Sequence, residues 1–151
     1  MSYYEEIEER WKVDQPLYEM LGTKVSAFLK NEILRHEVFP EVSHRTKELL
    51  SIIKKIQRKS KEKEYTYLDL KDKLGIRVIC SFSSHLDTVD EIIKENFIIE
   101  KAEYKREELD FDRLDYTSNH YDLFIKPSKF LIEDVTDFKD LVFELQVRSI
   151  N

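Results

Sequence analysis

The stretch "LVFELQVRS", residues 141–149, decides the fold class because its apolar and polar residues alternate. Such alternation is typical of a strand, in which successive side chains point to opposite faces of the sheet. The apolar face is formed by Phe143, Leu145 and Val147. The polar face carries an acid, an amide and a base, namely Glu144, Gln146 and Arg148. This strand is therefore expected to cover a core on one side, and its polar side needs a separate explanation.

A second stretch with the same alternation, "SNHYDLFI", covers residues 118–125 and puts Ser118, His120 and Asp122 on one face. If the two strands are neighbours, their polar faces form one patch of acid, base, amide and imidazole. Antiparallel sheets often have one solvated face, but histidine beside glutamine and arginine is uncommon on such a face. We interpret the patch as a candidate functional surface.

The remaining periodicity predicts helices first and most of the sheet later. Predicted helices cover residues 3–12, 16–34, 43–63 and 84–96. Predicted strands cover residues 76–82, 97–105, 118–125 and 141–149. Pro16 stands at the start of the second helix, where a missing N–H costs little, and Ser43 is a candidate N-cap of the third. This order indicates an α+β protein with a mixed sheet and a helical N-terminal part.

Composition limits the class of protein. The chain has 151 residues, about one ordinary domain, and a formal net charge of −6. That balance argues against a nonspecific nucleic-acid binder, which needs a basic surplus. The sequence shows neither a membrane span nor a signal peptide, so we expect a cytoplasmic protein with no membrane partner. The one cysteine, Cys80, lies in an apolar run and is expected to be a buried core thiol.

Charged residues near the predicted strand 76–82 add to the candidate site. Asp72 stands just before this strand, and Arg77 interrupts its apolar run. A charge inside an apolar run is rarely buried without a partner, so Arg77 is either half of a structural ion pair or a functional cation.

Basic residues also gather at the start of the predicted helix 43–63, where Arg45 and Lys47 fall in its first turn. They are either part of a solvated face or donors to a polyphosphate. Two carboxylates, Asp72 and Glu144, combined with such basic groups, indicate Mg²⁺-dependent phosphoryl chemistry. The sequence contains no glycine-rich phosphate loop, so cationic side chains have to bind the phosphates.

Four short motifs follow one another along the chain. They are R-x-K-x-x-x-S (Arg45, Lys47, Ser51), D-x-x-G-I-R (Asp72, Gly75, Arg77), Y-x-S-x-H (Tyr116, Ser118, His120) and E-x-Q-x-R (Glu144, Gln146, Arg148). Together they resemble the synthetase domain of RelA/SpoT enzymes, the (p)ppGpp synthetases, and in particular their small, synthetase-only members. The resemblance implies a nucleotidyltransferase-like fold related to polymerase β. It places N-terminal helices over residues 1–42 and the synthetase domain over residues 43–151.

The resemblance further implies that the enzyme transfers the β,γ-pyrophosphate of ATP to the 3′-hydroxyl of GDP or GTP. By position, Asp72 resembles the Mg²⁺ ligand, and Glu144 resembles a second ligand or the base for the hydroxyl. The ATP-side residues would be Arg45, Lys47, Ser51 and Arg77. The acceptor-side residues would be Tyr116, which resembles the aromatic that stacks on guanine, and Ser118, His120, Gln146 and Arg148.

Three features depart from the family pattern. Asp115 stands where the family usually has a glycine, and the loop at 106–115 is acidic where the family is basic. The family also continues beyond the last motif into a helix that completes the acceptor site. We therefore expect a chain truncated at its C-terminus, with a poorly closed site and exposed apolar surface that favours a homo-oligomer.

Two alternatives remain open. A toxin-type member of the family would modify the 3′ end of tRNA or an adenosine nucleotide, although the negative net charge disfavours an RNA acceptor. A catalytically weak domain that binds nucleotides and regulates is the other, and the presence of both carboxylates argues against it.

Overall fold

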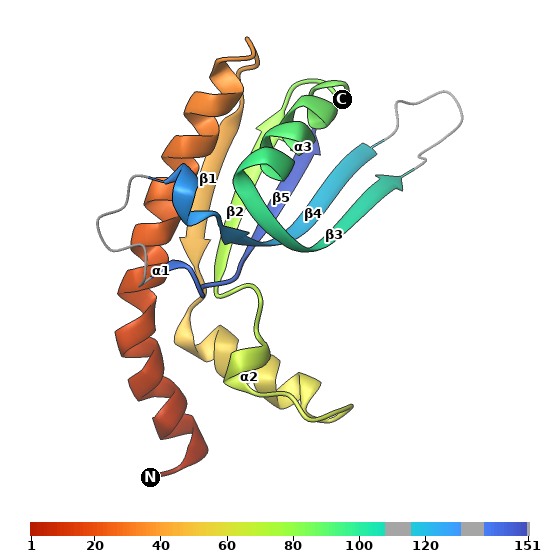
Figure 1. Cartoon of the computed structure of the whole chain (residues 1–151). Coiled ribbons are helices and arrows are strands. Elements are labelled where there is room, and N and C mark those ends of the chain that lie inside the picture. Colours follow the sequence, from red (N-terminus) through yellow and green to blue (C-terminus); the bar gives the residue numbers. More distant parts are fainter. Residues whose placement is uncertain (108–115, 131–137, 151) are drawn as a thin grey trace.

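The structure, a computed structural model, describes residues 1–107, 116–130 and 138–150. Its centre is a five-stranded sheet with the order β1-β2-β5-β4-β3 (Figure 1). The strands are β1 (Glu41–Thr46), β2 (Leu74–Cys80), β3 (Phe97–Glu107), β4 (Tyr116–Ile125) and β5 (Phe143–Ser149). Strands β2 and β5 run parallel, and the other neighbouring pairs are antiparallel. The predicted α+β class with a mixed sheet is confirmed.

Three helices accompany the sheet in the part of the chain for which the structure gives their bounds. They are α1 (Tyr3–Leu34), α2 (Leu49–Lys59) and α3 (His85–Asn96), with short 3₁₀ turns η1 (Tyr67–Asp69) and η2 (Pro127–Lys129). The predicted helix at 84–96 is confirmed, as are the strands predicted around 76–82, 97–105, 118–125 and 141–149. None of the helices in the described part of the chain has the length and apolar character that a membrane crossing requires.

The prediction of two helices separated at Pro16 is wrong, because α1 is continuous and Pro16 lies inside it. The buried stripe of α1 continues on both sides of the proline, from Trp11 to Tyr18 and Leu21. Pro16 itself faces solvent, as does Lys12, whose carbonyl loses its helical partner. Water can bind that carbonyl, so tertiary packing of the stripe outweighs the local cost of proline.

The prediction of one helix over residues 43–63 is also wrong. Residues 41–46 form β1, whose burial alternates and which pairs with β2, and α2 begins only at Leu49. Ser43 therefore is not an N-cap; Glu48 occupies that position. The helical period starts only at Leu49, and residues 41–46 form a strand because they pair with β2, about thirty residues further along the chain. Such long-range pairing leaves no local signal in the sequence. The predicted domain boundary between residues 42 and 43 falls inside β1.

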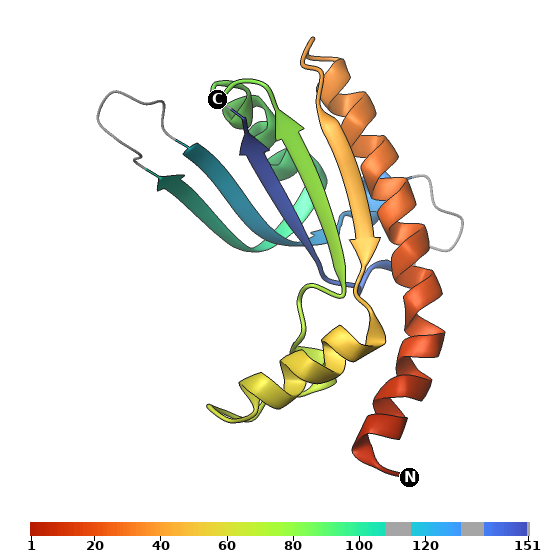
Figure 2. The same cartoon turned by 180° about the vertical axis from the view of Figure 1, so that it is seen from behind.

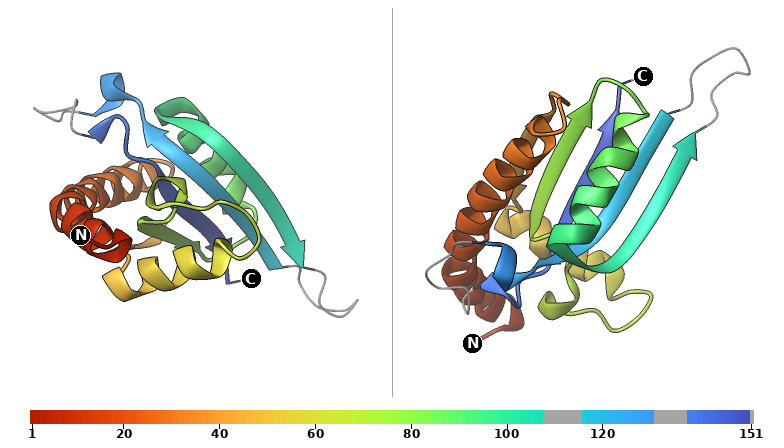
Figure 3. Two further views of the ribbon diagram at one scale, coloured as in Figure 1. Left: turned by 90° about the horizontal axis from the view of Figure 1, so that it is seen from below. Right: turned by 45° about the horizontal axis from the view of Figure 1, so that its top comes forward.

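The two faces of the sheet differ. Helices α1 and α3 cover one face (Figure 1), and α3 lies across the strands in the right-hand view of Figure 3. Beneath them lies the core, which includes Ile76, Val78, Leu145, Val147 and the buried thiol of Cys80. In the described part of the chain no helix crosses the other face, and α2 stands at its lower end (Figure 2).

Candidate functional site

Strand register arranges the open face into rows of side chains that run across all five strands. The row nearest α2 contains Arg45, Gly75, Glu144, Asp122 and Lys101. The next row contains Ser43, Arg77, Gln146, His120 and Glu103. The predicted pairing of the two polar strand faces is therefore confirmed, with His120 opposite Gln146 and Asp122 opposite Glu144.

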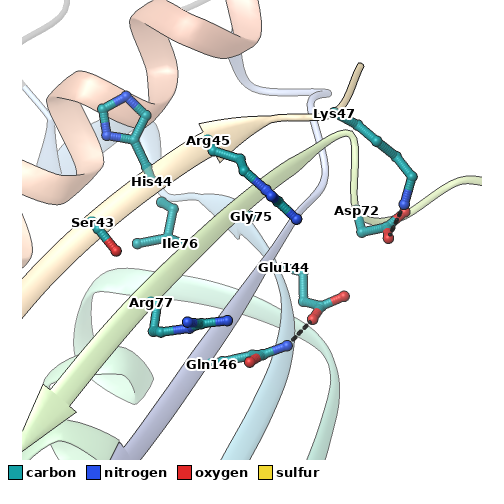
Figure 4. Close-up of a pocket in the computed structure, with 10 residues that line it drawn as sticks. All are labelled: Ser43, His44, Arg45, Lys47, Asp72, Gly75, Ile76, Arg77, Glu144 and Gln146. Atoms are coloured by element: carbon teal, nitrogen blue, oxygen red, sulfur yellow. Dashed lines mark hydrogen bonds and ion pairs between the residues drawn. The ribbon is translucent and has the colours of Figure 1, made fainter. Parts of the chain in front are cut away.

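One end of this face is hollowed into a pocket of about 330 Å³, which we call the arginine pocket (Figure 4). Its polar walls are formed by Ser43, Arg45, Lys47, Asp72, Arg77, Glu144 and Gln146. The guanidinium groups of Arg45 and Arg77 project into it from neighbouring strands. Arg77 is exposed on this face and has no ion pair among the described residues, so the structural ion-pair interpretation is wrong.

A second pocket of about 370 Å³, the lysine pocket, lies between α2 and strands β3 and β4. Its basic residues are Lys55, Lys59, Lys63, Lys71 and Lys101, and its acidic residues include Asp69, Glu103 and Asp122. His120 also lines it. Asp72 and Glu144 line both pockets, so these two carboxylates stand where the pockets meet. Both carboxylates therefore lie in the walls of one continuous cleft.

The carboxylate of Asp72 is held between two ammonium groups. Lys47 Nζ lies 2.8 Å from Oδ2, and Lys55 Nζ lies 2.9 Å from Oδ1. Burial alone would raise the pKa of Asp72, but the hydrogen bond from Lys47 and the positive charges of Lys47 and Lys55 outweigh it and lower that pKa. Asp72 is thus an anion at neutral pH, and its charge is balanced by two ammonium groups.

The other carboxylate, Glu144, is half-buried and accepts a 2.8 Å hydrogen bond from Gln146 Nε2. Its cross-strand neighbour is Asp122. Burial, followed by the negative charges of Glu144 and Glu100, raises the pKa of Asp122. Two carboxylates side by side repel one another, and a cation bound nearby would relieve that repulsion.

These donors can be tested against the expected Mg²⁺. Proteins usually hold Mg²⁺ by one or two carboxylates together with substrate phosphates. Within the described ranges, no group of three or more His, Cys, Asp or Glu side chains forms a metal cage. The pair of Asp72 and Glu144 therefore fits a Mg²⁺ that arrives with phosphates, and does not fit a metal held by the protein alone.

Three other predicted site residues, Ser51, Ser118 and Arg148, line neither of the two pockets. Ser51 is exposed in the first turn of α2 and lines neither pocket, and Arg45 and Lys47 precede that helix instead of starting it. Ser118 and Arg148 pair with each other in the third row and also line neither pocket. The Ser118 hydroxyl is bonded to His120 Nε2 at 2.9 Å.

Tyr116, the aromatic predicted on the acceptor side, is described in its backbone alone. The backbone of Tyr116 opens β4 opposite Glu107, but its side chain lies outside the described part of the chain. Asp115 and most of the acidic loop at 106–115 lie outside it as well.

Sequence reasoning missed part of the lysine pocket. Lys55 and Lys59 lie four residues apart on one side of α2, and Lys63 follows four residues later, beyond the end of the helix. This regular spacing could have identified them. Lys71 and Lys101 carried no such signal, because only the fold brings the segment before β2 close to β3.

The geometry defines a class of protein: a nucleotidyltransferase-like α+β domain with a polar sheet face and two carboxylates between two basic pockets. The sequence matches the family described as "Region found in RelA / SpoT proteins" over residues 44–151. The chain therefore belongs to this family. Comparison with curated proteins finds no match.

Solved structures show the same fold. Small alarmone synthetase 1 from Bacillus subtilis superposes with a TM-score of 0.71 at 20% identity, covering 94% of this chain and 72% of that one. The same enzyme bound to its product pppGpp gives 0.70 at 21% identity, with 94% and 73% covered. Its complex with AMPCPP gives 0.65 at 19% identity, with 93% and 70% covered.

Proposed function

We propose that this protein is an ATP-dependent pyrophosphokinase that transfers the β,γ-pyrophosphate of ATP to the 3′-hydroxyl of GDP or GTP. The observation that carries the proposal is the position of Asp72 and Glu144 in the walls of both basic pockets. A transfer between two nucleotides needs two adjacent phosphate-binding pockets with the reacting groups at their junction. Membership in the RelA/SpoT family supports the same reaction.

In this proposal the arginine pocket binds ATP. Arg45 and Arg77 project into it from β1 and β2, and planar guanidinium groups bind phosphate oxygens or stack on a base. Lys47 and Lys55, already at Asp72, would bind the phosphates that are transferred. The lysine pocket, with His120 on its wall, then receives the acceptor nucleotide.

The proposed reaction forms one bond and breaks one. The acceptor 3′-oxygen attacks the β-phosphorus of ATP, the bond from that phosphorus to the α,β-bridging oxygen breaks, and AMP leaves. Glu144 is suited to take the hydroxyl proton, because it lies half-buried between the pockets, hydrogen-bonded to Gln146. Mg²⁺ bound at Asp72 and Glu144 would neutralise the negative charge of the phosphates.

The test is transfer of label from γ-³²P-ATP to GDP, GTP, ATP or tRNA, each offered separately with Mg²⁺ and separated by chromatography. We expect labelled guanosine tetra- or pentaphosphate and equimolar AMP. Label on tRNA, or in an adenosine pentaphosphate formed from ATP as acceptor, would replace the proposed acceptor and retain the donor. Nucleotide binding without any transfer would overturn the enzyme and support a regulatory domain.

A further inference from the structure

The side chain of Lys73 is almost fully buried beside the site. Its residue is 4% exposed, and the described residues offer no carboxylate within ion-pair distance. Its charge instead lies over aromatic rings, 4.2 Å from the ring centre of Tyr67 and 6.0 Å from that of Tyr18. Aromatic faces attract cations, most strongly where water is excluded. We call Lys73, Tyr67 and Tyr18 the lysine clamp.

The lysine clamp is anchored on α1. Tyr18 belongs to that helix, and the Tyr67 hydroxyl donates to Asp14 Oδ2 at 2.6 Å. Arg10 contacts both Asp14 and Tyr67: its Nε lies 3.5 Å from Asp14 Oδ2, and its guanidinium lies 5.2 Å from the centre of the Tyr67 ring. The turn before β2 is therefore fixed to α1 through the side chain of Lys73.

The same turn carries Asp72. The Lys73 carbonyl accepts a 2.8 Å hydrogen bond from the backbone N–H of Lys47, while the Lys47 ammonium binds the Asp72 carboxylate. Asp72 lines both pockets and its neighbour Lys73 is buried against α1, so the two side chains leave the turn in opposite directions. Holding one of them fixes the direction of the other.

We propose that Lys73 is a positioning residue, whose ammonium, held by the rings of Tyr67 and Tyr18, sets the orientation of the Asp72 carboxylate toward the junction of the two pockets. An aliphatic side chain would fill this space without the cost of burying a charge. The cation gives the turn a directional attachment that an aliphatic residue cannot, because a ring face binds a cation at its centre. Its activity test rests on the proposed pyrophosphokinase function.

The decisive variants are Lys73→Met, which keeps the length and removes the charge, and Lys73→Arg, which restores a cation. With Lys73→Met we expect kcat for pyrophosphate transfer to fall about 10- to 100-fold, as for residues that orient a metal ligand. KM for ATP should change less than threefold, because Arg45 and Arg77 on β1 and β2 keep their places in the arginine pocket, and Lys73→Arg should recover most of the loss. Lys12→Met, the same change at an exposed position of α1, is the matched control.

Two variants of Tyr67 distinguish the contribution of its aromatic ring from that of its hydroxyl. Tyr67→Leu removes the aromatic face and should reproduce the kcat loss of Lys73→Met, without further loss when both changes are combined. Tyr67→Phe keeps the face and should stay within about threefold of wild type. Equal losses in the Phe and Leu variants would overturn the proposal, because the bond to Asp14 would then carry the effect.

Amide hydrogen exchange at Lys47 gives a readout that needs no activity. Release of the turn in Lys73→Met should speed exchange of this amide at least tenfold while amides of β5 keep their rates. Wild-type protection in that variant, or an unchanged kcat, would overturn the role of Lys73. If the wild-type protein transferred nothing, the proposed function would fail, and the exchange rate at Lys47 would still decide whether the lysine clamp holds the turn.

Discussion

The two faces of the sheet are made by the same strands, but one face is apolar and packs in the core, while the other is polar and carries the two pockets. Leu145 and Gln146 are adjacent in β5, yet Leu145 is fully buried under the helices and Gln146 lines the arginine pocket. The apolar face can hold the fold together without contributing any group to the chemistry. The polar face can concentrate charge because the opposite face supplies the packing. Because side chains alternate along a strand, one residue can contribute to the stability of the core while the next one lines the candidate site.

Strand β1 shows that the covered face also orients the open one. His44 is bonded to Glu19 at 3.0 Å and to Ser26 at 3.2 Å, both on α1, while the next residue, Arg45, faces the arginine pocket. Polar contacts with α1 therefore fix an edge strand whose other side binds phosphate in the proposed function.

The largest expected effect is on the open face. Asp72→Asn should lower kcat for pyrophosphate transfer by about 10²–10³-fold, because the site loses an anion needed to neutralise phosphate-bound metal. The far-ultraviolet circular dichroism spectrum should be unchanged, since Asp72 is not part of the core. Steady-state assays at saturating Mg²⁺ measure the loss, and normal turnover in this variant would contradict the metal role.

Substitutions at two adjacent residues of β5 test directly whether the apolar face carries stability and the polar face carries activity. Leu145→Ala should lower the free energy of unfolding by about 3 kcal/mol, as expected for a fully buried leucine. Gln146→Ala should change it by less than about 1 kcal/mol and should reduce turnover by releasing Glu144. Urea unfolding of both variants makes the comparison, and similar destabilisation of the two would show that the faces are not independent.

Arg45 tests the ATP side. Arg45→Ala should raise KM for ATP about tenfold, equivalent to roughly 1.4 kcal/mol and at the low end of a charged hydrogen bond, while KM for the acceptor stays constant. Arg58→Ala is the control, because Arg58 is exposed on α2 and lines neither pocket. A rise confined to the acceptor's KM would show that the two pockets are assigned in reverse.

Gly22 tests the attachment of β1 to α1. A Cβ at this position would lie 2.5 Å from His44 Cδ2 and 2.8 Å from Leu74 Cδ1. The overpacking should outweigh the gain in helix propensity, so Gly22→Ala should destabilise the protein by about 1 kcal/mol. Lys24→Ala, at an exposed position of the same helix, should stay within about 0.5 kcal/mol. Thermal unfolding measures both, and a more stable Gly22→Ala would mean that His44 can move away freely.

The smallest effect concerns pH. Because Lys47 and Lys55 lower the pKa of Asp72 in the folded protein, its ion pairs stabilise the fold above the unfolded pKa of about 3.9. That contribution should disappear as the pH falls through the lower, folded pKa. The stability difference between wild type and Asp72→Asn should therefore be constant from pH 7 to 5 and shrink below about pH 4. Urea unfolding at each pH tests this, and a difference that grew on acidification would reverse the sign.

Local patterns along the chain were sufficient to predict several helices and strands. The alternation of residues 118–125 and 141–149 and the helical period of 84–96 predicted β4, β5 and α3, because backbone geometry alone sets these periods. The motifs around Asp72 and Glu144 likewise identified two carboxylates that line the same cleft. The polar composition of both strand faces indicated where a site would lie.

Only the tertiary structure decided how these parts meet. The continuity of α1 through Pro16 depends on packing along its whole buried stripe, and β1 exists because it pairs with β2. The lysine pocket and the lysine clamp likewise join segments that are far apart in the chain. The fold also leaves Ser51 outside both pockets. Sequence periodicity reports which face of an element is apolar, but the identity of its partner is a long-range choice settled by the packing of the entire domain.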